Sequence, residues 1–352
     1  MQWTLLKILD VLIKLQCLDF GGLAVIAGFF ISIVYLLIIM TIENKIDLNQ
    51  ENYITKLIGF TIGALIIGVV CFIDDVKNVP AIGKLLAQII AAIVVVKSGI
   101  KIDNLDVPLL NLENMGNTFY VLLTIIWIVG ITNALNLIDG LDGLSTGISL
   151  ISCLSLLIIF SLNGSPMISI VLITALGGAL CGFLPYNFNP AKTFIGDTGS
   201  NFLGYCLSII SILGIAKTYT AIVIIAPLMV LALPIFDTLF AIVRRTIKGK
   251  SLKAIIEPDA GHLHHKMLKK GFTQKQAVLI LYGISAIFGM FAIILMDSGI
   301  WKALSFLIIM AIIIAMGYKE FFKQRLLYDS SEDEVKDEKI EGQIDIENMK
   351  EE

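Results

Sequence analysis

The stretch NTFYVLLTIIWIVGITNALNLIDGLDGLSTG, residues 117–147, joins an apolar run to a polar segment rich in Asn, Asp and Gly. The apolar part, 117–134, is long enough for a helix that crosses a lipid bilayer. The polar side chains follow at the end of this run and just beyond it: Asn133, Asn136, Asp139 and Asp142. Carboxylates at membrane depth are energetically costly and usually mark function. The stretch therefore predicts a membrane helix that ends in a functional site.

The rest of the chain repeats the apolar half of this pattern. Of its 352 residues, 57% are hydrophobic and 16% are charged, whereas a soluble domain is nearer half apolar and a quarter charged. Ten apolar segments are found at 21–42, 54–73, 81–98, 117–134, 143–162, 166–185, 199–215, 219–242, 276–296 and 299–317. In hydrocarbon, uninterrupted apolar runs satisfy their backbone amides as helices rather than as barrel strands. We therefore predict an all-α polytopic membrane protein with about ten transmembrane helices.

The two ends of the chain differ from this body. Residues 1–20 are apolar but carry Lys7, Asp10 and Lys14 about one helical face apart, which favours an amphipathic helix in the membrane interface. Residues 21–317 form one polytopic domain. Residues 318–352 form an acidic tail that we expect to be disordered and cytoplasmic, because its last 24 residues hold 11 acidic and three basic side chains. The five cysteines show no paired spacing, so no disulfide or metal framework is predicted.

Lys and Arg indicate the orientation, because cytoplasmic loops carry an excess of them. With ten spans both termini share one side, which holds 17 Lys and Arg before the acidic tail is counted, against six on the other side. The same side collects Asp74-Asp75, the 133–142 segment, Asn187 with Asp197, Asp237 and the histidines. We therefore expect an active site formed by cytoplasmic loops and helix ends, with both termini cytoplasmic.

The carboxylates in this set point to a divalent cation. Asp74, Asp75, Asp139, Asp142 and Asp197 would repel one another if they lay close together. Mg²⁺ relieves such repulsion, since it binds one or two carboxylates together with phosphate oxygens. Glycines beside these acids permit tight turns and a close approach of backbone N–H groups to phosphate. The sequence has no GxxxxGK[ST] motif, so the expected site differs from a P-loop.

The chain has three histidines, and all of them fall in the four-residue stretch His262, Leu263, His264, His265. A basic run from Arg244 to Lys270 surrounds this stretch. This charge pattern suits a polyanionic ligand such as a nucleotide diphosphate. A zinc site is the alternative, although no cysteine lies nearby. The basic side chains could instead enforce topology or bind anionic lipid. Phe194 either stacks on a base or anchors its loop.

These motifs resemble the polyprenyl-phosphate N-acetylhexosamine-1-phosphate transferases of glycosyltransferase family 4. The similarity runs from about Gly21 to about Met296 and is carried by the double Asp at 74–75, NALNLIDGLDGLSTG, FLPYNFNPAKTFIGDTGSNFLG, PIFDTLFAIVRR and HLHH. The HLHH form is closer to the branch that uses UDP-N-acetylglucosamine than to the phospho-MurNAc-pentapeptide translocases, which remain the alternative.

The resemblance implies the transfer of GlcNAc-1-phosphate from UDP-GlcNAc to undecaprenyl phosphate, which gives undecaprenyl-diphosphate-GlcNAc and UMP. It implies Mg²⁺, with Mn²⁺ as a substitute, and it places the step at the start of wall teichoic acid, O-antigen or similar glycopolymer synthesis at the plasma membrane. It further implies a homodimer and no nucleic-acid partner.

The resemblance also suggests a role for each matching residue. Asp197 would bind Mg²⁺, together with Asn136. Asp74 or Asp75 would lie near the lipid phosphate, and Asp139 and Asp142 complete the catalytic carboxylates. Substrate-binding residues would be Lys84, Asn133, Asn187, Phe194, Arg244, Arg245, His262, His264 and His265. Lys84 would bind phosphate, Asn187 and Phe194 would hold uridine, and the histidines and arginines would hold the diphosphate and sugar. A single displacement and a covalent aspartyl-phosphate route both remain open.

Two departures from the family separate this chain from its typical members. Relatives have an extra N-terminal span and a basic, proline-containing loop before Gly21-Gly22, whereas CLDFGG lacks them. Lys77 and Asn78 also stand where a further acid often follows the Asp pair. A catalytically impaired homologue is therefore a rival interpretation. A secondary transporter is another, but the acids gather at one face and no repeat is evident.

Overall fold

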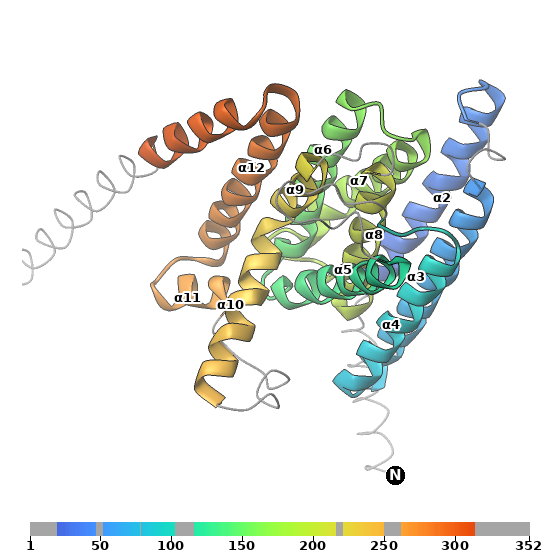
Figure 1. Ribbon diagram of the computed structural model, residues 1–352. Coiled ribbons are helices and arrows are strands. Elements are labelled where there is room, and N and C mark those ends of the chain that lie inside the picture. The colour runs from blue at the N-terminus through green and yellow to red at the C-terminus, as the bar shows by residue number, and fades with distance from the viewer. Residues whose placement is uncertain are drawn as a thin grey trace, which may run out of the picture. The chain divides into compact units, whose positions relative to one another are not determined.

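A computed structural model describes residues 20–46, 52–77, 79–102, 116–215, 221–249 and 262–313. These residues form the following helices (Figure 1): α2 (Gly21–Ile42), α3 (Tyr53–Lys77), α4 (Ala81–Lys97), α5 (Asn117–Ile138), α6 (Leu144–Leu162), α7 (Met167–Asn187), α8 (Gly196–Ile215), α9 (Ala221–Val230), α10 (Ala232–Gly249), α11 (Leu263–Lys269) and α12 (Gln274–Ser298). Within these ranges no strand is present, so the all-α prediction is confirmed. The expected interfacial segment up to residue 19 and the acidic tail lie outside the described residues.

Six helices are long and apolar enough to cross a membrane: α2, α3, α5, α6, α7 and α12. The chain is therefore a polytopic membrane protein, as predicted. The other four predicted spans are helical too, but less regular. Helix α4 has only 17 residues, α8 begins with the polar GDTGSN segment, and the last apolar segment forms a helix over Ile300–Ile313, which belongs to a separate compact unit. A total of ten spans stays a prediction.

The predicted span at 219–242 consists of two helices, α9 and α10, that meet at Leu231. Pro234 explains the position of this break, because a proline ring clashes with the carbonyl group four residues earlier. That residue is Val230, where α9 ends. Backbone hydrogen bonds from Leu231 to Pro227 and from Ile235 to Leu231 carry the chain across the junction.

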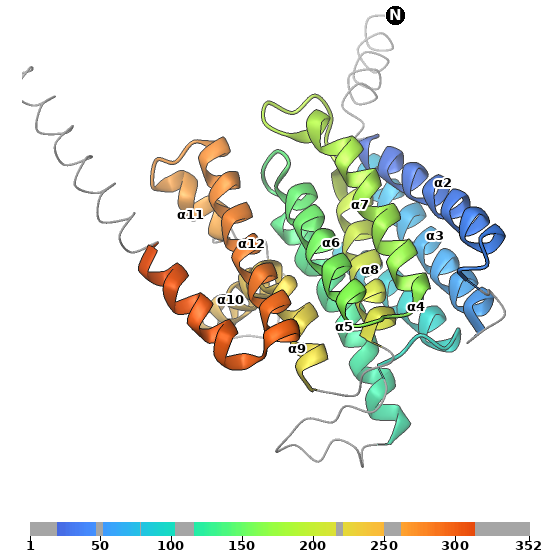
Figure 2. The same ribbon diagram turned by 90° about the horizontal axis from the view of Figure 1, so that it is seen from above.

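Helix α8 is the centre of the unit that ends at Gly299. It contacts α2, α3, α5, α6 and α7, which surround it in two perpendicular views (Figures 1 and 2). Its side chains from Phe202 to Leu213 are almost entirely buried. Small residues permit this close packing, since a side-chain carbon at Gly204 would lie 2.5 Å from the backbone of Thr132 on α5. The first turn of α8 is therefore held from several sides.

Gly21 and Gly22 bring the start of α2 against the turn that precedes α8. A β-carbon added to Gly22 would lie 2.5 Å from the amide nitrogen of Gly199 and from the carbonyl oxygen of Ile195. One added to Gly21 would lie 2.2 Å from the carbonyl oxygen of Phe194. The glycine pair therefore allows direct backbone contact with the segment that carries Asp197.

Candidate active site

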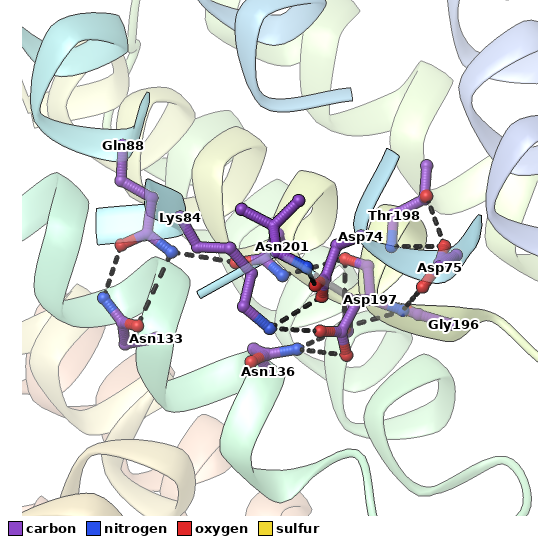
Figure 3. A network of polar contacts seen from close by, with 12 residues as sticks. Asp74, Asp75, Lys84, Gln88, Asn133, Asn136, Gly196, Asp197, Thr198 and Asn201 are labelled. Carbon is purple, nitrogen blue, oxygen red and sulfur yellow. Dashed lines mark hydrogen bonds and ion pairs between the residues drawn. The ribbon is translucent and has the colours of Figure 1, made fainter. Parts of the chain in front are cut away.

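The carboxylates of Asp74 and Asp197 meet on one ammonium group (Figure 3). Lys84, near the start of α4, donates to Oδ2 of Asp74 at 2.7 Å and to Oδ2 of Asp197 at 2.6 Å. The second oxygen of Asp74 accepts a hydrogen bond from the amide of Val79. Asp74 is only 8% exposed. Lys84 thus supplies the positive charge that lets two acids from α3 and α8 lie side by side.

Asp75 caps the amino terminus of α8 from the end of α3. Its Oδ1 accepts from the amide of Asp197 at 3.1 Å, and its Oδ2 accepts from the amide and the hydroxyl of Thr198. The first amides of a helix have no partner inside the helix, and a carboxylate there also interacts favourably with the helix dipole. The Asp74-Asp75 pair therefore has two separate tasks, one at Lys84 and one at α8.

Asn136 approaches Asp197 from the end of α5. Its amide nitrogen donates to Oδ1 of Asp197 at 3.1 Å and to the hydroxyl of Ser200 at 3.0 Å. Asn136 and Asp197, the predicted metal-binding pair, are therefore adjacent. In this arrangement the asparagine presents its N–H side, rather than its oxygen, to the carboxylate.

A cavity of about 340 Å³ opens beside these groups. It is lined by Asp75, Asp139, Gly140, Leu141, Asp142, Asn187, Phe194, Ile195, Gly196 and Asp197. Ligand pockets of this size are common for small molecules and cofactors. The structure thus brings together six of the predicted site residues, from four separate stretches of the chain, around one open space.

Two of the cavity residues are fixed by hydroxyl groups of α6. Ser145 donates to Oδ1 of Asp139 at 2.6 Å. Thr146 donates to the side-chain oxygen of Asn187 at 2.7 Å, and the amide of Asn187 donates to the carbonyl oxygen of Thr193 at 3.0 Å. Phe194 follows directly and is 50% exposed. Its ring is therefore free to face a ligand, as base stacking would require.

Asp142 holds the loop between α7 and α8. Its Oδ2 accepts from the side chain of Asn189 at 2.8 Å and from the amide of Ala191 at 3.2 Å. Asn189 also donates to Gln274 at the start of α12. These contacts give Asp142 a positioning task in addition to its place in the cavity wall.

The histidine segment is anchored by Asp237 of α10. Its Oδ2 lies 2.8 Å from Nδ1 of His262, and its Oδ1 accepts from the amide of Leu263 at 2.8 Å. His264 packs against the cavity turn, since a β-carbon at Gly140 would lie 2.2 Å from its Nε2. Burial, followed by the neighbouring His265, lowers the pKa of His264 from 6.5 to about 4. His264 is therefore neutral at physiological pH.

The remaining predicted residues lie apart from the cavity wall. Arg244 and Arg245 are partly buried on α10, beyond Asp237. Asn133 pairs with Gln88 of α4 on the side of Asn136 away from the polar loops. The sequence motifs assign no role to Gln88 or Asn201. Gln88 is an amide within an apolar span, and that signal could have singled it out. Asn201 ends the polar GDTGSN segment and carries no such signal.

The donor set suits a hard cation. Asp75, Asp139 and Asp197 bring carboxylate oxygens to the cavity wall. Among the described residues, no three His, Cys, Asp or Glu side chains form a ready-made cation site. Mg²⁺ needs no such cage, because it keeps several waters and binds through one or two carboxylates plus substrate phosphates. The residues present fit this mode of binding.

Fold and site together define a polytopic membrane protein with an acid-lined cavity where its helices end. A family model described as glycosyl transferase family 4 matches residues 57–215. The probable undecaprenyl-phosphate N-acetylglucosaminyl 1-phosphate transferase of Bacillus subtilis is 41% identical over 258 residues, which are 73% of this chain and 71% of that protein. The decaprenyl-phosphate N-acetylglucosaminephosphotransferase of Mycolicibacterium smegmatis is 34% identical over 271 residues, 70% of this chain and 66% of that protein. A phospho-N-acetylmuramoyl-pentapeptide-transferase of Staphylococcus epidermidis is 33% identical over 207 residues, 55% of this chain and 61% of that protein.

The chain therefore belongs to glycosyl transferase family 4 and is a polyprenyl-phosphate sugar-1-phosphate transferase. The family resemblance inferred from the motifs is confirmed.

Proposed function

We propose that this enzyme transfers GlcNAc-1-phosphate from UDP-GlcNAc to undecaprenyl phosphate and releases UMP. The observation that carries the proposal is the 41% identity to the Bacillus subtilis protein. The family model match over residues 57–215 includes the residues that line the acid-lined cavity. The product, undecaprenyl-diphosphate-GlcNAc, would start the synthesis of a cell-envelope glycopolymer such as a teichoic acid or an O-antigen-like chain.

The reaction forms one bond and breaks one. An oxygen of the lipid phosphate attacks the β-phosphorus of UDP-GlcNAc, and the bond from that phosphorus to the bridging oxygen breaks as UMP leaves with the electron pair. A phosphate monoester has a second pKa near 6, so the acceptor is largely dianionic at pH 7 without a general base. Positioning and charge compensation are then the main requirements.

We assign these requirements to the residues around the cavity. Phe194 and Asn187 would hold the uridine, and the histidine segment with Arg244 and Arg245 would hold the diphosphate and sugar. Mg²⁺ at Asp197, whose carboxylate Asn136 holds, would screen the charge of the phosphates; Asn136 could ligate the ion only through its side-chain oxygen. Lys84, already beside Asp197, would add a positive charge to the same region.

The hydrogen bonds of the Asp pair support a single displacement over a covalent aspartyl-phosphate. Both oxygens of Asp75 accept bonds from the start of α8, and both oxygens of Asp74 accept bonds from Val79 and Lys84. A carboxylate engaged in this way is a weaker nucleophile, because its lone pairs and its orientation are taken up. The pair is better suited to fixing Lys84 and the start of α8.

We further propose that the cavity faces the cytoplasm, since the Lys and Arg distribution places the loops of the site there. Nucleotide-sugars are cytoplasmic, which fits this orientation. A homodimer remains a prediction.

A membrane assay tests the reaction. Radiolabelled UDP-GlcNAc, undecaprenyl phosphate and Mg²⁺ are incubated with the enzyme, and butanol-soluble label and UMP are measured. We expect transfer by the wild type, and its loss with EDTA or in the Asp197→Asn variant. Asp297→Asn serves as the matched control, because Asp297 lies on α12 and bonds its neighbour Ser298 away from the cavity. Absence of transfer from folded wild-type protein would refute the proposal.

A parallel reaction with UDP-MurNAc-pentapeptide tests the alternative suggested by the Staphylococcus epidermidis relative. We expect no transfer from this donor. Preferential use of it would overturn the proposed sugar. Failure with both donors would favour the impaired-homologue interpretation.

A further inference from the structure

A second polar layer lies one helical turn below the ion pairs of the candidate active site (Figure 3). The upper layer consists of Lys84, Asn136 and Asp197, from α4, α5 and α8. The lower layer consists of Gln88, Asn133 and Asn201 from the same three helices. Residues three or four positions apart share a helix face, so each lower residue lies directly beneath an upper one.

Hydrogen bonds between side-chain amides connect the three residues of the lower layer. Asn133 donates to the side-chain oxygen of Gln88 at 2.6 Å, and Gln88 donates to the side-chain oxygen of Asn201 at 2.9 Å. Gln88 also donates to the side-chain oxygen of Asn133, at 3.5 Å. Two further bonds go to main-chain oxygens: Asn133 donates to that of Val129 at 2.8 Å, and Asn201 to that of Asp197 at 2.8 Å.

Because these amides are buried, their hydrogen bonds favour one relative position of the three helices. Gln88 is 2% exposed and Asn201 is 1% exposed, so neither amide is open to solvent. A buried amide that loses its partner costs about 1–3 kcal/mol. Sliding or rotating any of the three helices would break the set, so the layer favours one register of α4, α5 and α8.

The lower layer acts on the upper one through the backbone of Asp197. Asn201 holds the main-chain oxygen of Asp197, while Lys84 and Asn136 hold its carboxylate. The position of this side chain therefore depends on the spacing of the three helices one turn deeper. That spacing is set by neutral side chains that touch neither the cavity nor the charged groups of Lys84 and Asp74.

We propose that Gln88, Asn133 and Asn201 are positioning residues that align Lys84, Asn136 and Asp197 for the transfer. The proposal rests on the proposed function for its catalytic consequence, but the alignment itself is a property of the fold. It also gives Asn133 a task different from the substrate contact expected from the sequence.

The first test replaces Gln88 by methionine, which keeps the length of the side chain and removes its hydrogen bonds. Because misplacement by about 1 Å can cost about 10²-fold in rate, we expect kcat to fall by about that factor. The KM for UDP-GlcNAc should change little, because Asn187 and Phe194, to which we assign the uridine, are not bonded to the lower layer. A larger effect on KM than on kcat would contradict the proposal.

Tyr205→Phe is the matched control. Tyr205 lies on α8 one turn beyond Asn201, and its hydroxyl donates to the carbonyl oxygen of Phe60 on α3 at 2.7 Å. The substitution removes one buried hydrogen bond between helices without touching the layer. We expect it to lower the Tm but to leave kcat unchanged. Equal losses of kcat in both variants would show that the layer contributes only to packing and would contradict a positioning role.

The exchanged pair Gln88→Asn with Asn133→Gln provides the rescue. Each single change alters the span between α4 and α5, whereas the pair restores it. We expect the double variant to recover much of the kcat that each single variant loses. Additive losses would count against a positioning role.

A readout without substrate separates this proposal from the proposed function. Hydrogen–deuterium exchange in detergent reports on the first turn of α8, residues 196–201. We expect faster exchange there in Gln88→Met and unchanged exchange in Tyr205→Phe. Unchanged exchange in Gln88→Met would overturn the proposal even if transfer is observed, and faster exchange would support it even if UDP-GlcNAc is not the donor.

Discussion

Substitution of Gly22 by alanine tests how closely α2 must approach the active-site turn. The added β-carbon would lie 2.5 Å from two backbone atoms, the nitrogen of Gly199 and the oxygen of Ile195. Ordinary contacts of this kind begin near 3.4 Å. Neither backbone atom can move away as a flexible side chain would. The start of α2 and the segment from Ile195 to the first turn of α8 therefore have to separate by about 0.9 Å, the difference between these two distances.

We expect Gly22→Ala to lower the stability only slightly and the transfer rate strongly. Overpacking destabilises by about 1–3 kcal/mol, and the better helix propensity of alanine offsets about 1 kcal/mol of that. A net loss of about 0–2 kcal/mol should leave the protein folded. The displaced segment carries Asp197, however, and a shift of this size can reduce the rate by about 10²-fold.

Gly28→Ala is the control for this prediction. Gly28 lies on the same helix, and its added β-carbon would meet only the β-carbon of Ala179, at 3.7 Å, which is an ordinary contact. Both variants are compared with the wild type in the transfer assay and by thermal unfolding in detergent. We expect Gly28→Ala to retain activity with an equal or higher Tm. Equal activity of the two variants would refute the role that we give to the close approach of α2.

Three further predictions concern charged groups. Lys84→Met should lower the Tm because the carboxylates of Asp74 and Asp197 lose their shared cation. Since Lys84 is 23% exposed and Asp197 is 35% exposed, we expect a loss of stability smaller than the about 3–5 kcal/mol that breaking a fully buried pair costs. An unchanged Tm would contradict the assignment. Asp237→Asn should reverse the tautomer of His262, because an amide N–H would face Nδ1 in place of a carboxylate oxygen. We expect transfer activity to fall and the ¹⁵N NMR spectrum of labelled histidine to report the changed tautomer. An unchanged spectrum would argue against the pairing of Asp237 with His262. Because the pKa of His264 is about 4 in the folded protein against 6.5 ordinarily, the unfolded state takes up the proton first as the pH falls. Stability should therefore be full above pH 6.5 and should decrease down to about pH 4 by at most about 1.4 kcal/mol per pH unit; a His264→Gln variant with an identical pH dependence of Tm would exclude this group as the cause.

Local sequence was sufficient for most of the helices, because a bilayer demands long apolar runs and the residues at their ends interrupt them. The break at Leu231 was the clearest miss within the described residues. Pro234 lies inside an apolar segment, so the hydrophobic pattern continues through it while the backbone does not. The position of Pro234 within the segment would have predicted the helix boundary.

The candidate site was predictable as a set of residues but not as a set of contacts. Asp75, Asp139, Asp142, Asn187, Phe194 and Asp197 all line one cavity, as their collection at one face suggested. Which oxygen accepts from which donor depends on helices far apart in the sequence. The distinct partners of Asp74 and Asp75, which are neighbours in the chain, illustrate this.

The sequence by itself determined that the chain enters a membrane, that it is helical, that it belongs to this transferase family and that its polar residues gather where helices end. Those properties follow from composition, hydrophobic length and local motifs, which act over a few turns. Only the tertiary structure decided that Lys84 joins Asp74 to Asp197 and that amides of α4, α5 and α8 form a second layer beneath them. These contacts join residues up to 113 positions apart. They arise because buried polar groups must find partners, and the packed helices determine which partners are within reach.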